Sequence, residues 1–96
     1  MNYEFEFSPE KNQQLKEERG ISFEEIILLI DEGCLIDVVE HPNKKKYPGQ
    51  KFYIIDVDGY AYIVPFITDK KGSIFLKTIY PSRKATKEYL EQKESQ

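Results

Sequence analysis

The chain has 96 residues, of which 40% are hydrophobic and 32% charged, with seven tyrosines and six phenylalanines. This composition predicts a single folded domain over residues 1–96, and it excludes both a disordered protein and a Rossmann-type cofactor domain. The net charge of −3 hides an asymmetry, because residues 1–40 carry three cations against eleven carboxylates, whereas residues 41–96 carry eleven against six. The asymmetry indicates either a basic working surface in the second part or charges that simply lie in solvent.

The cysteine and histidine content argues against a disulfide or a metal site. Cys34 is the only cysteine and His41 the only histidine, so we expect neither a bound metal nor a cofactor. The opening residues MNYEFEF lack the basic and apolar segments of a signal peptide, and no apolar run is long enough to cross a membrane. We therefore expect a cytoplasmic protein without membrane contact.

The first part of the chain predicts one strand and two helices. Aromatic and acidic residues alternate from Tyr3 to Phe7, which is typical of a half-buried strand. Ser8 and the proline after it favour the start of a helix that ends at Gly20. A capping box predicts a second helix from Ser22, which ends at Gly33. Its buried face should consist of four residues: Phe23, Ile26, Ile27 and Ile30.

From Cys34 onward the hydrophobic spacing changes to alternation, which predicts four strands. Their expected ranges are Leu35–Glu40, Gln50–Val57, Tyr60–Thr68 and Ile74–Tyr80. Asp58-Gly59 predicts a hairpin turn between the second and the third. One alternating face of Tyr60–Phe66 should be buried, and Pro65 predicts an edge or a bulge in its strand.

A last helix is predicted to begin at Pro81-Ser82 and to extend to about Leu90, followed by a polar tail over 91–96 that frays. The element order is then β-α-α-β-β-β-β-α. It predicts an α+β fold in which the two N-terminal helices pack on one face of a mostly antiparallel sheet, with a C-terminal helix at the end.

Two runs of cations are candidates for binding phosphate. Arg83 and Lys84 occupy the first positions of the last helix, where cations oppose the helix dipole at a cost of about 0.3–1 kcal/mol each. Free N–H groups and cationic side chains together suit a phosphate, although a surface cap that merely tolerates them is equally compatible. The run Lys44–Lys46 either contacts a phosphate backbone or lies in solvent.

Three further side chains are candidates for a site. Lys77 shares the expected strand face of Phe75 and Ile79, so it either extends to solvent at the rim of the sheet or points into a site. Tyr80 ends that strand and could supply a hydroxyl, a stacking ring or a core side chain. His41 titrates near neutrality without perturbation, and it is either solvated or available for proton transfer.

Two motifs lie near the two ends of the chain. The first is Phe7-Ser8-x-x-Lys11 followed by Arg19-Gly20-Ile21-Ser22-Phe23-Glu24-Glu25, and the second is Ile79-Tyr80-Pro81-Ser82-Arg83-Lys84-Ala85-Thr86. Together they resemble the opening and the ending of BrnT toxins, where an Arg-Lys-Ala-Thr run opens the last helix. The chain departs from that family at Glu18-Arg19, where the family has Lys-His, at Ser8 in place of Asp, and at Leu15 in place of Asn.

The resemblance implies a RelE-like toxin of a type II toxin–antitoxin system. Such a toxin is a metal-independent endoribonuclease that arrests growth, and it pairs with a DNA-binding antitoxin, as a homodimer or in a heterotetramer. We expect the antitoxin to cover the basic surface of the second part of the chain. The alternative is a catalytically inactive RelE-like module that binds a protein or RNA.

The resemblance and the charges together suggest roles for individual residues. Arg83 with Lys77 or Lys84 should stabilise the charge of the reacting phosphate, and Tyr80 or His41 should move protons. Arg83 should be exposed, without a carboxylate partner, in a cleft that it shares with Lys77, Lys84 or Arg19. In the alternative interpretation it pairs with Glu88. The expected RNA-binding side chains are Lys11, Arg19, Lys44, Lys45 and Lys46.

Overall fold

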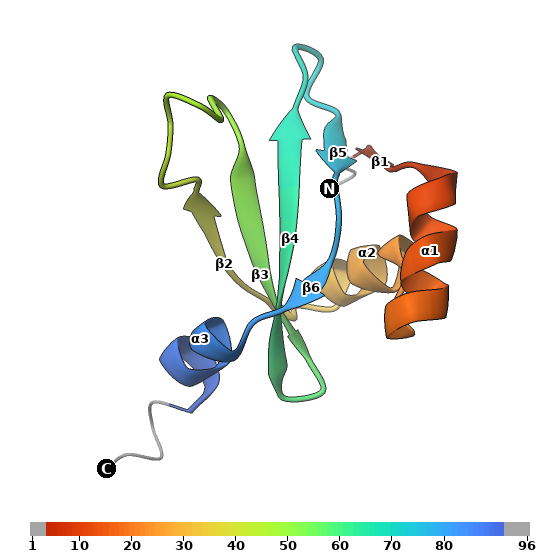
Figure 1. The fold of residues 1–96 in the computed structure, drawn as a ribbon, viewed down its shortest axis with the longest axis vertical. Coiled ribbons are helices and arrows are strands. Elements are labelled where there is room, and N and C mark those ends of the chain that lie inside the picture. Colours follow the sequence, from red (N-terminus) through yellow and green to blue (C-terminus); the bar gives the residue numbers. More distant parts are fainter. Residues whose placement is uncertain (1–3, 92–96) are drawn as a thin grey trace.

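A computed structural model describes residues 4–91, and Figure 1 shows its arrangement of helices around a mixed sheet. In chain order the elements are β1 (Phe5–Glu6), α1 (Pro9–Arg19), α2 (Phe23–Asp31), β2 (Leu35–Glu40), β3 (Lys51–Val57), β4 (Tyr60–Thr68), β5 (Ile74–Leu76), β6 (Tyr80–Pro81), α3 (Arg83–Ala85) and η1 (Thr86–Leu90), where the backbone of α3 continues as a π-helix. The α+β class predicted from the sequence is confirmed.

Both N-terminal helices begin and end as their capping residues predict. The side chain of Ser8 accepts a hydrogen bond from the backbone N–H of Lys11, and Gly20 ends α1 with a positive φ of 68°. Gly20 can adopt this conformation without strain because it has no Cβ. At the start of α2, Ser22 and Glu25 form the complete capping box.

A buried asparagine joins the two helices. The Oδ1 of Asn12 accepts the backbone N–H of Phe23 at 2.7 Å, and its Nδ2 donates to Glu24 Oε1 at 2.8 Å. That hydrogen bond from Asn12 lowers the pKa of the Glu24 carboxyl group below its ordinary value. Because Asn12 satisfies an otherwise unpaired N–H in the first turn of α2, it fixes the position of α2 relative to α1.

The sheet is mostly antiparallel, with the strand order β1-β5-β4-β3-β2 and with β6 beside β4. β1 is the exception, because it pairs with β5 in parallel. Of the strand expected over Tyr3–Phe7, the structure has Phe5–Glu6, and Tyr3 lies outside the described residues.

The strand expected over Ile74–Tyr80 is interrupted. β5 ends at Leu76 and β6 begins at Tyr80, so that residues 77–79 lie opposite only two residues of β4, one of which is Pro65. The carbonyl of Pro65 accepts a hydrogen bond from the backbone N–H of Lys77 at 2.8 Å. Pro65 has no backbone N–H, so it cannot donate a second hydrogen bond to this segment. The edge or bulge predicted in the strand of Pro65 is therefore misplaced: β4 is central and pairs regularly with β3, and the extra residue lies in the neighbouring segment, opposite Pro65.

The extra residue changes which side chains face the core. Leu76 and Ile79 are both fully buried in the same cluster, whereas Phe75 and Lys77 are exposed. The expectation that Lys77 and Ile79 share a face is wrong, because a bulge shifts the alternation by one position.

Two apolar clusters cover opposite faces of the sheet. The larger contains residues of α1, α2 and the strands: Leu15, Ile21, Phe23, Ile26, Tyr53, Ile55, Val64, Phe66, Ile74, Leu76 and Ile79. The smaller packs the C-terminal helix on the other face: Ile54, Ala61, Ile63 and Ala85, with Tyr89 and Leu90 beside them.

The burial of β4 and that of α2 differ from the sequence-based expectation. The strand β4 is buried on both faces rather than one, since α3 and η1 cover Ala61 and Ile63. In α2, Phe23 and Ile26 are fully buried as expected, but Ile27 and Ile30 are only half-buried at the margin of the larger cluster.

Candidate functional site

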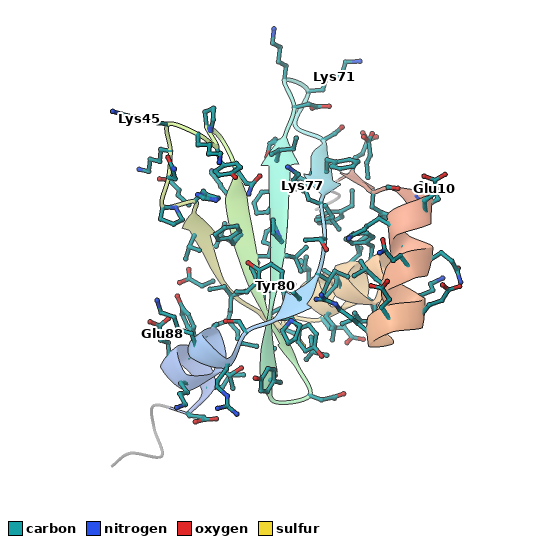
Figure 2. All side chains as sticks on the ribbon, in the orientation of Figure 1. Glu10, Lys45, Lys71, Lys77, Tyr80 and Glu88 are labelled. Atoms are coloured by element: carbon teal, nitrogen blue, oxygen red, sulfur yellow. The ribbon has the colours of Figure 1, made fainter. Side chains whose placement is uncertain are left out.

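The two motifs at the ends of the chain meet at one hollow. It has a volume of about 490 Å³ and is lined by Arg19, Tyr62, Tyr80 and Pro81. Arg19 is the last residue of α1, and its Nη1 donates a hydrogen bond to the carbonyl oxygen of Ile79 at 2.9 Å. This bond holds the guanidinium beside β6, on which Figure 2 shows Tyr80.

The guanidinium of Arg19 keeps most of its hydrogen-bonding capacity for a ligand. An arginine has five N–H donors, and the bond to Ile79 uses one of them. The side chain is exposed, and its position at the C-terminal end of α1 is electrostatically favourable for a cation. Planar guanidinium groups bind phosphate through two parallel N–H bonds, so Arg19 is suited to an anion.

Tyr80 adds a neutral hydroxyl to the hollow. A tyrosine phenol is protonated at neutral pH, and burial raises the pKa of Tyr80 further above its ordinary value, so the hydroxyl can donate a hydrogen bond to a ligand. The residues that line the hollow include no histidine or carboxylate. The arrangement can therefore bind an anion, stabilise its charge and donate a proton.

The segment after the hollow anchors the last helix. Ser82 caps α3 by accepting the backbone N–H of Ala85 at 3.0 Å. The buried hydroxyl of Thr86 accepts the backbone N–H of Ala61 and donates to the carbonyl of Ser82. Ser82, Ala85 and Thr86 thus have structural roles that fix the helix against β4.

Arg83 and Lys84 have no such role. Both side chains are exposed, and within residues 4–91 neither forms an ion pair or a side-chain hydrogen bond. The alternative ion pair between Arg83 and Glu88 is thus absent from that part of the chain. Because only the N-cap Ser82 separates Pro81 from α3, the two cations follow the hollow closely in the sequence.

The structure does not bring Lys77 or His41 to this hollow. Lys77 Nζ instead donates to Gln50 Oε1, at 3.2 Å, just before β3 begins. His41 lies in the β2–β3 loop, where its ring stacks on Tyr47 at 4.3 Å and its Nδ1 accepts the backbone N–H of Asn43.

Lys11 and the lysines of the β2–β3 loop are not among the residues that line the hollow either. Lys44 forms an ion pair with Glu40 at 2.7 Å, Lys46 lies over the ring of Tyr47, and Lys45 is exposed in the same loop. The side chain of Lys11 is half-buried in the first turn of α1.

Sequence reasoning missed Tyr62 as a lining residue. It was expected only as one of several residues on an alternating strand face, and nothing in its sequence neighbourhood distinguishes it from Tyr60. Its register opposite Pro81 brings it to the hollow, and this register depends on the bulge that the sequence did not locate.

Comparisons with known proteins do not identify the chain: no family model, curated protein or solved structure matches it. In the part of the chain that the structure describes, no group of three or more histidine, cysteine or carboxylate side chains could hold a metal ion. None of the helices between residues 4 and 91 is long and apolar enough to cross a membrane.

Proposed function

We propose that this protein is the toxin of a toxin–antitoxin pair, a RelE-like endoribonuclease of the BrnT type that acts on RNA at the hollow of Arg19 and Tyr80. The observation that carries the proposal is that Arg19, whose guanidinium is tethered to the Ile79 carbonyl, and Tyr80 line the same hollow. Each residue comes from one of the two segments that resemble BrnT toxins, and the two segments are distant in sequence. Their meeting at one hollow supports a shared role for the two segments.

The proposed reaction is attack of a ribose 2′-OH on the adjacent phosphorus. The new 2′ O–P bond closes a 2′,3′-cyclic phosphate, and the bond to the 5′ oxygen breaks. Arg19 stabilises the negative charge of the phosphorane through its free N–H donors. Tyr80 donates its phenolic proton to the leaving 5′ oxygen and regains one from solvent, while the proton of the 2′-OH passes to water.

Arg83 and Lys84 extend the proposed site along the RNA. They follow the hollow closely in the chain, they are exposed, and no carboxylate within residues 4–91 neutralises either. Cations at the start of a helix repel its dipole, so an incoming phosphate offsets an unfavourable arrangement. We assign to them the phosphates that flank the scissile one.

The decisive experiment compares Arg19→Ala with Lys16→Ala, which removes an exposed cation from the same helix. Loss of one preorganised donor to a developing anion lowers the cleavage rate by about 10²–10³-fold, so we expect Arg19→Ala to lose that much and to relieve growth arrest. Lys16→Ala should retain full activity, since its ion pair with Glu24 is long and exposed. Equal cleavage by both variants, with unchanged melting, would refute the site.

The second candidate function is a RelE-like module that binds RNA or a protein without cleaving RNA. It is favoured by one observation, that the lining residues of the hollow include no histidine or carboxylate to serve as a base. Tight RNA binding by the purified chain without cleavage products or growth arrest would favour this function over the first.

The proposed antitoxin is testable separately. Co-expression with the product of the adjacent gene should give a single complex in size-exclusion chromatography. Two separate species at micromolar concentration would count against a toxin–antitoxin pair.

A further inference from the structure

Seven lysines gather at one end of the sheet. β2 and β4 end there and β3 and β5 begin there, because these strands are antiparallel to their neighbours. We call residues 40–51 and 68–77 the lysine end. Its cations are Lys44, Lys45, Lys46, Lys51, Lys70, Lys71 and Lys77. Figure 2 shows three of them in the upper part of the view, Lys45 on the β2–β3 loop, Lys71 on the β4–β5 loop and Lys77 below it, with Glu88 on the C-terminal helix at the lower left.

The carboxylates at the lysine end offset little of this charge. Glu40 pairs with Lys44, and Asp69 Oδ1 accepts two backbone N–H groups of its own turn. Glu4 reaches the same turn through Ser73. Most of the lysine side chains are therefore available to phosphate groups, and their summed potential attracts a polyanion.

Exposed apolar side chains lie among these cations. Phe75 and Ile67 are cross-strand partners, and their side chains are 36% and 40% exposed. They lie on the same face of the sheet as α3 and η1, but these helices cover a different part of that face. Tyr47, which is 38% exposed, lies in the loop before β3. Rings that alternate with cations bind unpaired bases by stacking, whereas the bases of a duplex are already stacked.

A second hollow lies at the lysine end. It has a volume of about 280 Å³, and Tyr47, Gln50 and Lys51 are among its lining residues. Gln50 Oε1 accepts a hydrogen bond from Lys77, which orients the amide and leaves its N–H groups for a ligand. An aromatic side and an oriented amide suit the edge of one unpaired base.

We propose that the lysine end is a docking surface for single-stranded RNA, separate from the hollow of Arg19 and Tyr80. Its lysines contact the backbone, Phe75 stacks on one base, and the hollow beside Gln50 holds another. The choice of RNA over other single-stranded nucleic acids rests on the proposed function. A protein partner is disfavoured because the core of a protein interface is depleted of lysine.

The test measures binding with an RNA that cannot be cleaved. A fluorescent 2′-O-methyl oligouridine of ~10 nucleotides lacks the attacking hydroxyl, so anisotropy reports affinity alone. Lys45→Ala/Lys71→Ala should weaken binding about tenfold at low salt and reduce the salt slope by about 1.4, since each phosphate contact contributes ~0.7 for a single strand. Phe75→Ala should weaken binding about fivefold or more.

Matched controls separate this surface from general charge and apolar area. Lys16→Ala/Lys87→Ala removes two exposed cations outside the lysine end, and Leu28→Ala removes an exposed apolar side chain from α2. Both should bind the oligomer within about twofold of the parent chain. A control that weakens binding as much as Lys45→Ala/Lys71→Ala, or a duplex that binds as tightly as the single strand, would overturn the proposal.

Failure of the docking-surface proposal is distinguishable from failure of the proposed nuclease function. If the chain binds the oligomer through the lysine end but never cleaves ordinary RNA, the docking surface stands and the nuclease does not. If the chain cleaves RNA while Lys45→Ala/Lys71→Ala binds and cleaves like the parent, the docking surface is wrong and the nuclease stands. Loss of antitoxin binding alone in that variant would likewise show that the surface serves a protein.

Discussion

Replacement of Thr86 by valine isolates the anchor of the last helix. Thr86 is 3% exposed, and its Oγ1 accepts the N–H of Ala61 at 2.9 Å and donates to the carbonyl of Ser82 at 2.7 Å. Valine keeps the shape of threonine but has no hydroxyl. The carbonyl of Ser82 still accepts the backbone N–H of residue 86, so the change leaves one buried group, the N–H of Ala61, without an acceptor.

The expected loss follows from that single unpaired donor. A buried N–H without an acceptor costs about 1–3 kcal/mol, which corresponds to a decrease in Tm of roughly 4–8 °C per kcal/mol for a domain of this size. Thr86→Ser keeps the hydroxyl and loses one methyl group, for about 1 kcal/mol. Thermal and urea unfolding followed by circular dichroism measure both variants. A serine variant less stable than the valine variant would refute the reasoning, because methyl packing would then outweigh the hydrogen bonds.

The hydrogen bonds of Asn12 and the raised pKa values of two tyrosines give further predictions. Asn12→Ala leaves a buried backbone N–H unpaired and should lower the unfolding free energy by about 1–3 kcal/mol in urea titrations, whereas the exposed Gln13→Ala should change it by less than ~0.5 kcal/mol. A hydrogen bond to Asp37 raises the pKa of Tyr89 and burial raises that of Tyr80, so two tyrosines should ionise late in an alkaline absorbance titration, and Asp37→Asn should leave one. Because both folded pKa values are raised, their contribution to stability is complete below the unfolded value near about pH 10 and is lost as the pH rises through the folded values.

Local signals in the sequence predicted the helices and turns well. Ser8, Ser22 and Gly20 mark helix ends through hydrogen bonds to residues close in the chain, so neighbouring residues determine them. The turn at Asp58-Gly59 is also determined by neighbouring residues, because these two residues readily adopt the positive φ values of 53° and 87° that the turn needs. The hydrophobic alternation after Cys34 likewise predicted the central strands, because it repeats over many residues.

The candidate site was less predictable, because it depends on pairing between distant segments. The extra residue opposite Pro65 reverses which of Ile79 and Tyr80 faces the core, and no pattern within residues 74–81 contains that information. The sequence identified Arg19 and Tyr80 separately, through the two motifs. It could not show that the guanidinium of one would be bonded to the chain beside the other.

The bond between Arg19 and Ile79 makes a lysine substitution informative. A guanidinium can donate to the carbonyl of Ile79 and still present a planar pair of N–H groups to phosphate. The three donors of an ammonium group are on one nitrogen atom, so a lysine cannot bond the Ile79 carbonyl and also bind phosphate through two parallel N–H bonds. Arg19→Lys keeps the charge, so we expect RNA affinity within about threefold of the parent chain, because non-specific attraction depends on charge. Cleavage should fall by about 10²-fold, nearly as far as in Arg19→Ala. Single-turnover cleavage and anisotropy on the same preparations separate the two effects. Full cleavage by the lysine variant would mean that the hollow requires only a positive charge, and the geometric role assigned to the Arg19 guanidinium would then be wrong.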